Sequence, residues 1–260
     1  MSYKILSSTG SGGGGGGVTL PPYPTGPHIP DGDTMAHWTF NGTVASEVNS
    51  PTTDMSASDE AIRYTPIYSG SANQAILGGD QTLGTIGATY NVPALDRGGA
   101  TPVTVAFCVY VAELNTGTPL VKLSSDTGGF TEKFVLAMNP EGVLVYGHCP
   151  NSYTYEEGVH VGGSAANGRP VVPKGEWCWV GLSRNADGKS GKIWVSKADG
   201  TVDKCTWTNT AASRTGTSTR WSIFRNWNNI RVKGCMYSLI LKNVASSDAE
   251  LDIMRAQCGF

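Results

Sequence analysis

The sequence predicts an all-β protein: an antiparallel β-sandwich with one short C-terminal helix and an extended N-terminal arm. Three observations lead to this fold class. About a dozen short runs rich in β-branched and aromatic residues are separated by turns containing Gly, Pro or Asn. Charged residues form only 15% of the 260 residues, and glycine occurs 34 times. Good helix signals occur in one segment, close to the C-terminus.

Composition argues against several classes of protein. A formal net charge of −2 without a concentrated basic face argues against nucleic-acid binding. With 39% hydrophobic residues and seven tryptophans, the chain is not a disordered polyelectrolyte. No apolar run approaches the roughly 18 to 20 residues that cross a bilayer, so no membrane insertion is expected. The first residues lack the apolar core of a signal peptide, and Ser2 stands where N-myristoylation requires glycine. We therefore expect cytoplasmic synthesis without a signal peptide.

Residues 1–34 differ from the rest and are predicted to be an anchoring arm, with a single domain over 35–260. Six consecutive glycines form a flexible tether, and the proline-rich stretch over 21–30 forms a stiffer spacer. The apolar segment ahead of the glycines could add as a strand to another chain, although a free tail fits equally well. The residues assigned to anchoring are Tyr3, Ile5, Leu6, Gly12, Gly17, Pro21 and Tyr23.

Strands are expected from residue 36 onward. The strongest candidate is 103–111, which is apolar or β-branched almost throughout and should be covered on both faces. Turns at 139–142 and 185–188 predict two hairpins. In the strand over 177–183, alternation places Cys178, Val180 and Leu182 on one face and the two tryptophans on the other. The remaining expected strands are 36–42, 61–67, 74–77, 85–90, 120–123, 134–138, 143–146, 191–197, 221–224 and 232–241.

The expected helix begins with a capping box, Ser247-Asp248-Ala249-Glu250, in which the Ser and Glu side chains satisfy two otherwise unpaired N–H groups. Leu251, Ile253 and Met254 then form its predicted apolar stripe.

Six cysteines have no metal-binding spacing, and the closest two are 23 residues apart. Several lie in strand-like runs, where cysteine behaves as a small buried hydrophobe, so free buried thiols are favoured. Disulfides, including ones between subunits, stay open from the sequence. The positions are Cys108, Cys149, Cys178, Cys205, Cys235 and Cys258.

The best candidate for ligand binding is the loop over 151–160, because tyrosine rings stack on sugars and carboxylates accept hydrogen bonds from sugar hydroxyls. It contributes Tyr153, Tyr155, Glu156, Glu157 and His160. A second candidate, over 225–229, contributes Trp227 and Asn228. The alternative for both loops is that their aromatic residues cover sheet edges or contact a neighbouring subunit.

No catalytic signature was found, so the chain is predicted not to be an enzyme. Glu156 and Glu157 are adjacent and would point to opposite faces of a strand, which does not suit glycoside hydrolysis. Neither a Gly-x-Ser-x-Gly elbow nor a phosphate-binding Gly-Lys-Ser/Thr occurs. His28, His37, His148 and His160 have no partners that the sequence identifies, and we interpret them as structural or surface residues.

Three segments resemble the concanavalin A-like lectin/glucanase superfamily, in its laminin-G-like and pentraxin-like branch. The run over 36–42 resembles the family's first strand, the pair 176–184 and 192–195 its central hairpin, and 234–243 followed by 247–251 its last strand and helix. The resemblance implies a jelly roll. Calcium-binding branches of the family use clustered Asp, Asn and Glu ligands, but no such cluster can be placed here. No cofactor or metal site is therefore predicted, and the resemblance alone leaves Ca²⁺ open.

Two functions follow from these features. The first is a structural accessory protein of a virus particle, of the capsid-decoration or tail-fibre type found in bacteriophages. Residues 1–34 would then bind other virion proteins, and the location would be the virion. The alternative is an adhesion module that binds cell-surface carbohydrate through the loops over 151–160 and 225–229. The sequence leaves the oligomeric state open.

Overall fold

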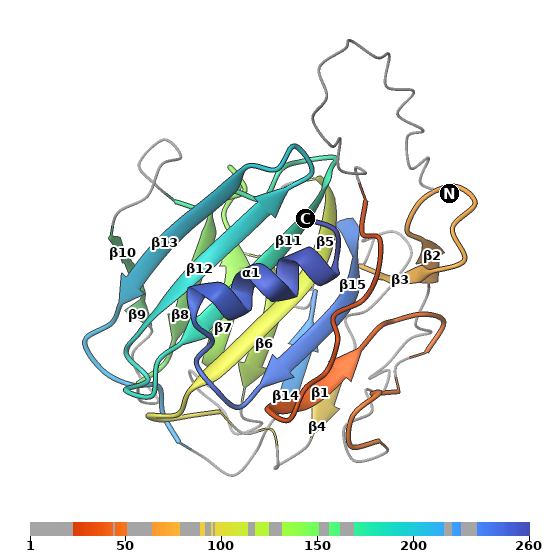
Figure 1. The fold of residues 1–260 in the computed structure, drawn as a ribbon. Coiled ribbons are helices and arrows are strands. Elements are labelled where there is room, and N and C mark those ends of the chain that lie inside the picture. Colours follow the sequence, from red (N-terminus) through yellow and green to blue (C-terminus); the bar gives the residue numbers. More distant parts are fainter. Residues whose placement is uncertain are drawn as a thin grey trace.

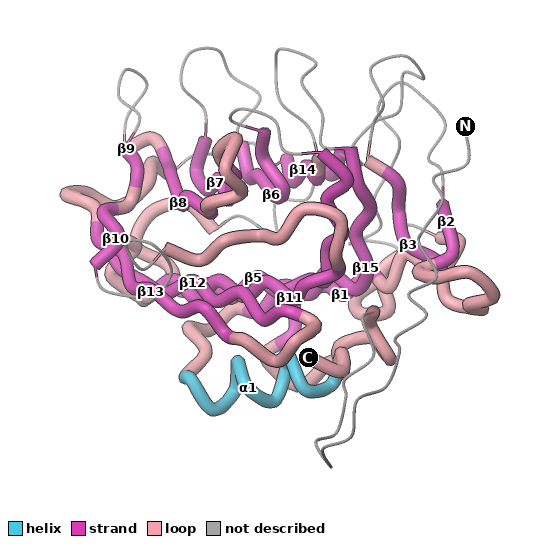
Figure 2. Tube along the Cα trace, turned by 90° about the horizontal axis from the view of Figure 1, so that it is seen from above, coloured by secondary structure: helices cyan, strands magenta, loops and turns pink. Residues whose placement is uncertain are grey.

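The computed structural model describes residues 23–43, 45–50, 64–78, 89–91, 95, 97–113, 118–124, 132–150, 156–161, 169–215, 220–224 and 233–260. Two antiparallel sheets are stacked face to face, and a single described helix packs on the outer side of the larger sheet (Figures 1 and 2). This arrangement confirms the predicted β-sandwich with a short C-terminal helix.

The larger sheet is centred on β5, the strand that the sequence marked as most strongly β-forming. Its neighbours β11 and β15 pair with it over most of their length. In order, the sheet contains β10 (Val159–Val161), β13 (Val202–Thr208), β12 (Ser190–Lys197), β11 (Trp177–Arg184), β5 (Val103–Glu113), β15 (Lys233–Lys242), β3 (Gln74–Leu77) and β2 (Tyr64–Pro66), with β1 (Thr34–Trp38) also on β15.

The smaller sheet has the order β4 (Thr89–Asn91), β14 (Arg220–Ile223), β6 (Thr118–Ser124), β7 (Glu132–Met138), β8 (Leu144–His148) and β9 (Glu156–Glu157). Both predicted hairpins form, as β7–β8 and β11–β12. Strands β9, β10 and β13 were not predicted. Parts of the predicted strands 61–67 and 85–90 lie outside the described residues.

Two apolar clusters lie on opposite faces of the larger sheet. Cys178, Val180 and Leu182 of β11 point into the cluster between the sheets. Trp177 and Trp179 of the same strand point into an outer cluster, which we call the outer core. This is the alternation that the sequence predicted, and it explains why β5 is buried on both faces.

Helix α1 (Asp248–Gln257) covers the outer core and begins with the predicted capping box. The Ser247 hydroxyl accepts the Glu250 N–H, while the Glu250 carboxylate accepts the Ser247 N–H. The predicted apolar stripe was partly wrong. Leu251 and Met254 are buried, but Ile253 is 59% exposed. A residue turns about 100° from its neighbour around a helix, so position 253 falls off the face that 251 and 254 share.

The described part of the expected arm, residues 23–34, packs against the domain alongside β15 (Figure 1). The Tyr23 ring stacks on Tyr68 with centroids 4.1 Å apart, and Asp31 forms an ion pair with the nearly buried Lys242. His28 is 1% exposed. A free arm that extends to residue 34 does not agree with these contacts. The anchoring residues Tyr3, Ile5, Leu6, Gly12, Gly17 and Pro21 lie outside the described residues.

Candidate functional site

The sequence-predicted ligand residues fall partly outside the described structure. Tyr153, Tyr155, Trp227 and Asn228 are not among the described residues. Glu156 and Glu157 form β9, and His160 is the central residue of β10. Among these predicted residues, Glu156 is the one whose side chain the structure describes. The site is therefore built outward from Glu156.

Glu156 lies where the chain crosses from one sheet to the other. Strand β9 pairs with β8 of the smaller sheet, and β10 pairs with β13 of the larger sheet, with Gly158 between them. A Cβ atom at Gly158 would lie 3.1 Å from Cβ of Trp207, so this close approach favours glycine. The crossing closes one edge of the sandwich and brings β8, β9 and the end of β13 together (Figure 1).

The Glu156 carboxylate holds the segment that follows β13. The Thr210 hydroxyl donates to Oε1, and the Ala211 N–H donates to Oε2 at 3.4 Å. Burial tends to raise the pKa of Glu156, but these hydrogen bonds outweigh it and lower the pKa below its usual value. Glu156 is therefore ionised, and its carboxylate has the structural role of holding residues 210 and 211. Its side chain is still 20% exposed, so part of the carboxylate faces solvent.

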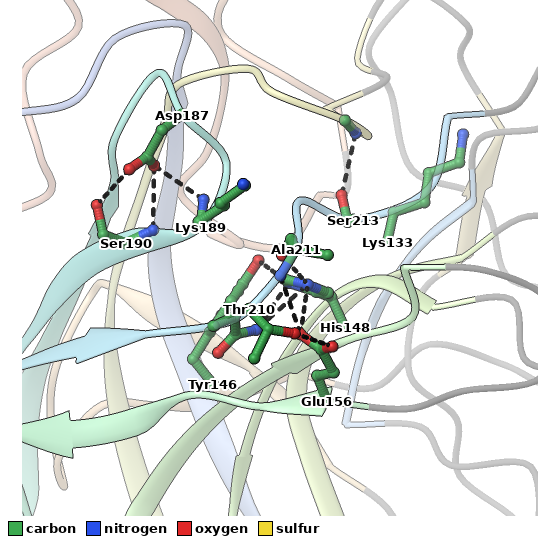
Figure 3. Close-up of polar contacts among 12 residues, drawn as sticks. Lys133, Tyr146, His148, Glu156, Asp187, Lys189, Ser190, Thr210, Ala211 and Ser213 are labelled. Carbon is green, nitrogen blue, oxygen red and sulfur yellow. Dashed lines mark hydrogen bonds and ion pairs between the residues drawn. The ribbon is translucent and has the colours of Figure 1, made fainter.

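Beneath Glu156, a chain of buried hydrogen bonds fixes His148 (Figure 3). Because a carbonyl can only accept, His148 Nε2 donates to the Ala211 oxygen at 3.0 Å. Its Nδ1 then accepts from the Tyr146 hydroxyl at 3.1 Å, and that hydroxyl accepts from Arg184 Nη1 at 3.1 Å. Burial, with a contribution from the Arg184 charge, lowers the pKa of His148 to about 4, so the imidazole is neutral near pH 7.

The side chains that support His148 include stacked aromatic rings and the buried cation of Arg184. The Tyr146 and Trp207 rings stack with centroids 4.0 Å apart. The Arg184 guanidinium is fully buried, and its described partners are neutral oxygens, including the Thr101 carbonyl at 3.1 Å and the Tyr146 hydroxyl. Two buried polar atoms in β13 and the segment after it, Trp207 Nε1 and Asn209 Oδ1, have no hydrogen-bond partner among the described residues. An unsatisfied buried group costs about 1 to 3 kcal/mol, so these two atoms lower the stability of this edge of the sandwich.

The β11–β12 turn completes the corner. Asp187 accepts from the Lys189 and Ser190 N–H groups and from the Ser190 hydroxyl, which fixes the turn. The Lys189 carbonyl accepts the Asn209 N–H at 2.7 Å. Figure 3 shows this turn beside the His148 and Glu156 contacts. We refer to the segments 146–150, 156–158, 185–190 and 209–213 as the edge corner.

The sequence did not reveal the edge corner. Glu156 was singled out for the aromatic loop in front of it, whereas its observed contacts come from residues more than 50 positions later. His148, interpreted from the sequence as a structural or surface residue, is a buried structural one. One signal was available in the sequence. Buried residues alternate with exposed ones over 202–208, which is the pattern of a strand, but the charged Asp203 at one of the inward-facing positions interrupts the apolar side of the pattern.

A second polar cluster lies in the outer core and contains serine, histidine and glutamate in series. Trp179 Nε1–H donates to His28 Nε2 at 2.8 Å, so the His28 proton is on Nδ1, which donates to Ser238 Oγ at 2.8 Å. The Ser238 oxygen also accepts the His28 N–H, so its own proton is directed at His37 Nε2, 3.1 Å away.

This series resembles a catalytic triad in residue type but not in accessibility. His37 Nδ1 lies 3.0 Å from Glu47 Oε2 without hydrogen-bond alignment. Both Ser238 and His37 are fully buried, and the Ser238 oxygen already accepts two hydrogen bonds. We therefore interpret the cluster as the attachment of residues 23–33 to the sheet.

Within the described residues, no group of three or more His, Cys, Asp or Glu side chains is arranged to hold a metal ion. In the same part of the chain, the helix is too short and too polar to cross a bilayer.

No protein-family model and no curated protein matches this chain. Solved structures do match it. Domain 4 of AbnA, a GH43 extracellular arabinanase from Geobacillus stearothermophilus solved with arabinotriose, aligns over 85% of this chain and 98% of that domain, with 17% identity and a TM-score of 0.60. The receptor binding domain of botulinum neurotoxin D aligns over 86% of this chain with 10% identity and a TM-score of 0.56.

The binding domain of botulinum neurotoxin DC in complex with SialylT aligns over 88% of this chain, with 10% identity and a TM-score of 0.52. This chain spans about half (52%) of each neurotoxin domain but nearly all of the arabinanase domain. At these identities the likeness establishes the fold alone, an antiparallel β-sandwich. None of the three structures is a virion component.

Proposed function

We propose that this chain is a non-catalytic carbohydrate-binding module, and that the edge corner with the adjoining loop over 151–155 forms its binding surface. The observation that carries the proposal is the alignment with nearly the whole of a domain solved with arabinotriose. A second aligned domain was solved with SialylT, which extends the support to a different glycan.

The chemistry of the edge corner suits a sugar. Sugar hydroxyls donate and accept hydrogen bonds, and the corner offers a partly exposed carboxylate in Glu156 and an exposed hydroxyl residue in Thr210. Tyr153 and Tyr155, which precede Glu156 directly in the sequence, would supply the stacking rings. The corner lacks the features of a glycosidase, because the Glu156 carboxylate is held by backbone and hydroxyl groups and its described neighbour His148 is a neutral imidazole.

Calorimetric titration of the full chain with arabinotriose and with a sialylated oligosaccharide tests the proposal. Binding of either sugar is expected, and Tyr155→Ala is expected to weaken it about tenfold, equivalent to about 1.4 kcal/mol. Tyr68→Ala is the matched control, because Tyr68 lies beside β2, at the opposite edge of the larger sheet from β10. Failure of the wild-type chain to bind any sugar of a broad panel would refute the proposal.

Attachment to a virion through the N-terminal residues stays a separate prediction. It concerns residues 1–34, of which residues 1–22 lie outside the described structure, and it does not depend on sugar binding. Deleting residues 2–20 and measuring incorporation into particles tests it directly.

A further inference from the structure

The N-terminal segment over residues 23–30 is attached to the larger sheet by few buried side chains. Within this segment only Pro24 and His28 are buried. The N–H groups of Thr25 and Ile29 donate to oxygens at the end of α1, but both of these residues are exposed. The attachment therefore depends on the imidazole of His28, which is the one buried polar side chain that the segment contributes.

The hydrogen bonds of His28 and His37 require that both rings be neutral. In each ring one nitrogen acts as an acceptor. His28 Nε2 accepts the Trp179 N–H at 2.8 Å, and His37 Nε2 accepts the Ser238 hydroxyl at 3.1 Å. A nitrogen that carries a proton cannot accept, so neither ring can take up a second proton without losing its bond.

The surroundings offer no acceptor for such a proton in the attached state. On His28 Nε2 it would point at the Trp179 N–H, and two donors would face each other across 2.8 Å. On His37 Nε2 it would need the Ser238 oxygen, which already accepts the main-chain and ring N–H groups of His28. If both rings were charged, two buried cations would lie with centroids 6.4 Å apart. The attached segment therefore disfavours protonation of either histidine.

The titratable and charged groups around the two rings come from each element that packs against them. They are Glu47 after β1, Tyr237 and Lys242 on β15, Cys108 on β5, Cys258 at the end of α1, and Asp31 next to the segment. Burial raises the pKa of Tyr237 and of Cys108, so both stay protonated in acid.

Two of these neighbours also respond to acid. Burial tends to raise the pKa of Asp31, but its contacts with Lys242 and Thr34 outweigh this and lower the pKa below its usual value. Burial likewise tends to raise the pKa of Cys258, but neighbouring Cys108 and His28 lower it to about 5. Both groups are therefore removed in control variants.

Acid shifts the balance toward a detached segment. Burial, and after it the neighbouring His28, lowers the pKa of His37 to about 3, against about 6.5 for an imidazole in water. Glu47 Oε2 lies 3.0 Å from His37 Nδ1 and would favour a charged ring, but its side chain is 49% exposed and the contact is not aligned as a hydrogen bond. Between the two pKa values, detachment lets His37 bind a proton that the attached state excludes. Detachment therefore becomes more favourable as the pH falls.

We propose that residues 23–30 form an acid-released strap: protonation of His28 and His37 detaches the segment from the larger sheet while the sandwich stays folded. Release would uncover the part of the outer core around Trp179 and Ser238, beside α1. For each histidine that takes up a proton, the ratio of detached to attached chains should rise about tenfold per pH unit.

Fluorescence anisotropy on the full chain tests the proposal. All six native cysteines are free and buried, so a maleimide dye labels a thiol introduced at an exposed position under native conditions. Ile29→Cys places the dye on the segment and Ile253→Cys places it on α1, where the native side chains are 65% and 59% exposed. From pH 7 to about pH 4, the anisotropy should fall for the Ile29→Cys dye and stay constant for the Ile253→Cys dye. Constant anisotropy at both positions would overturn the proposal, and so would a parallel fall at both, because the whole domain would then be unfolding.

Three further variants, each combined with Ile29→Cys, assign the response. Asp31→Asn and Cys258→Ser remove the two neighbouring groups that also respond to acid, and each should keep the fall in anisotropy. Loss of the fall in either one would overturn the assignment to the histidines. His37→Gln cannot take up the proton, so its response should be about tenfold shallower per pH unit, and an unchanged slope would contradict the role of His37. If His37→Gln is already detached at pH 7, the two labelled chains and the other two variants still decide the question.

Discussion

At the scale of single residues, Ser238 connects more separate parts of the chain than its small side chain would suggest. It sits at a bulge of β15 with a φ of 53°, a left-handed conformation that is uncommon for a residue other than glycine. This backbone places one hydroxyl between His28 and His37, which come from the N-terminal segment and from β1. One small side chain therefore joins three parts of the chain.

We predict that Ser238→Ala destabilises the protein by about 3 kcal/mol, because it leaves buried donors of His28 and an acceptor of His37 unpaired. Urea denaturation followed by tryptophan fluorescence measures the loss. Ser69→Ala is the control, since Ser69 is exposed in the β2–β3 turn and should change stability by less than about 0.5 kcal/mol. Equal stability of the two variants would show that the cluster does not hold the segment.

Contacts of this kind lie beyond sequence reasoning. His28 and Ser238 are 210 positions apart, and nothing in the proline-rich stretch around His28 indicates that its ring is buried. Residue patterns report local structure, so they identified the alternation of Trp177 to Leu182 correctly. They could not show which distant groups would satisfy a buried imidazole.

At the scale of elements, the edge corner depends on β8, β9 and the segment after β13 staying together. His148 contributes by being neutral: in the folded state its pKa is about 4, against about 6.5 in an unfolded chain. The charged groups nearest to it are Arg184, which opposes its protonation, and Glu156, which favours it. Between these two pKa values the unfolded state binds a proton that the folded state does not. Stability must therefore fall as the pH falls through this range.

We predict that His148→Gln has a shallower pH dependence than the wild type. Between pH 7 and pH 4.5, the wild type should lose about 2 to 3 kcal/mol more than the variant, on the basis of 1.36 kcal/mol per pKa unit. Denaturation midpoints at four or five pH values provide the measurement. His37 titrates in both proteins and cancels in the comparison, whereas the titration of Glu156 depends on His148 and forms part of the measured difference. Parallel curves would mean that His148 becomes protonated in the folded state without cost.

The elements that could be predicted are those whose pattern is set by burial alone. Strand β5 is apolar or β-branched almost throughout because both faces are covered, and the start of α1 is indicated by its capping box. Strand β13 was missed because Asp203 takes an inward position, where it pairs with Lys197 at 2.9 Å. Strands β9 and β10 are too short for any periodicity, since they comprise two and three residues. The candidate site lies at those short strands. The sequence therefore indicated the loop that precedes Glu156, but not the contacts that Glu156 makes.

At the scale of the whole molecule, the outer core makes the N-terminal segment part of the fold. The larger sheet carries apolar side chains on both faces, but the smaller sheet covers only one of them. Helix α1 and residues 23–33 lie over the other face (Figures 1 and 2). Residues 23–33 therefore contribute to the stability of the fold, ahead of its first strand.

Two truncations distinguish a fold that includes residues 23–33 from a domain that starts at residue 35. Deletion of residues 2–22 leaves every described contact in place and should not change the denaturation midpoint. Deletion of residues 2–33 removes His28 and Asp31. Trp179 Nε1 and the nearly buried Lys242 then lose these partners, and Ser238 keeps its hydrogen bond to His37 but loses those to His28. At about 1 to 3 kcal/mol for each buried group left unpaired, the longer deletion should cost at least about 4 kcal/mol. If calorimetry gave both truncated chains the stability of the full chain, the segment would be an appendage and the outer core would be closed by α1 alone.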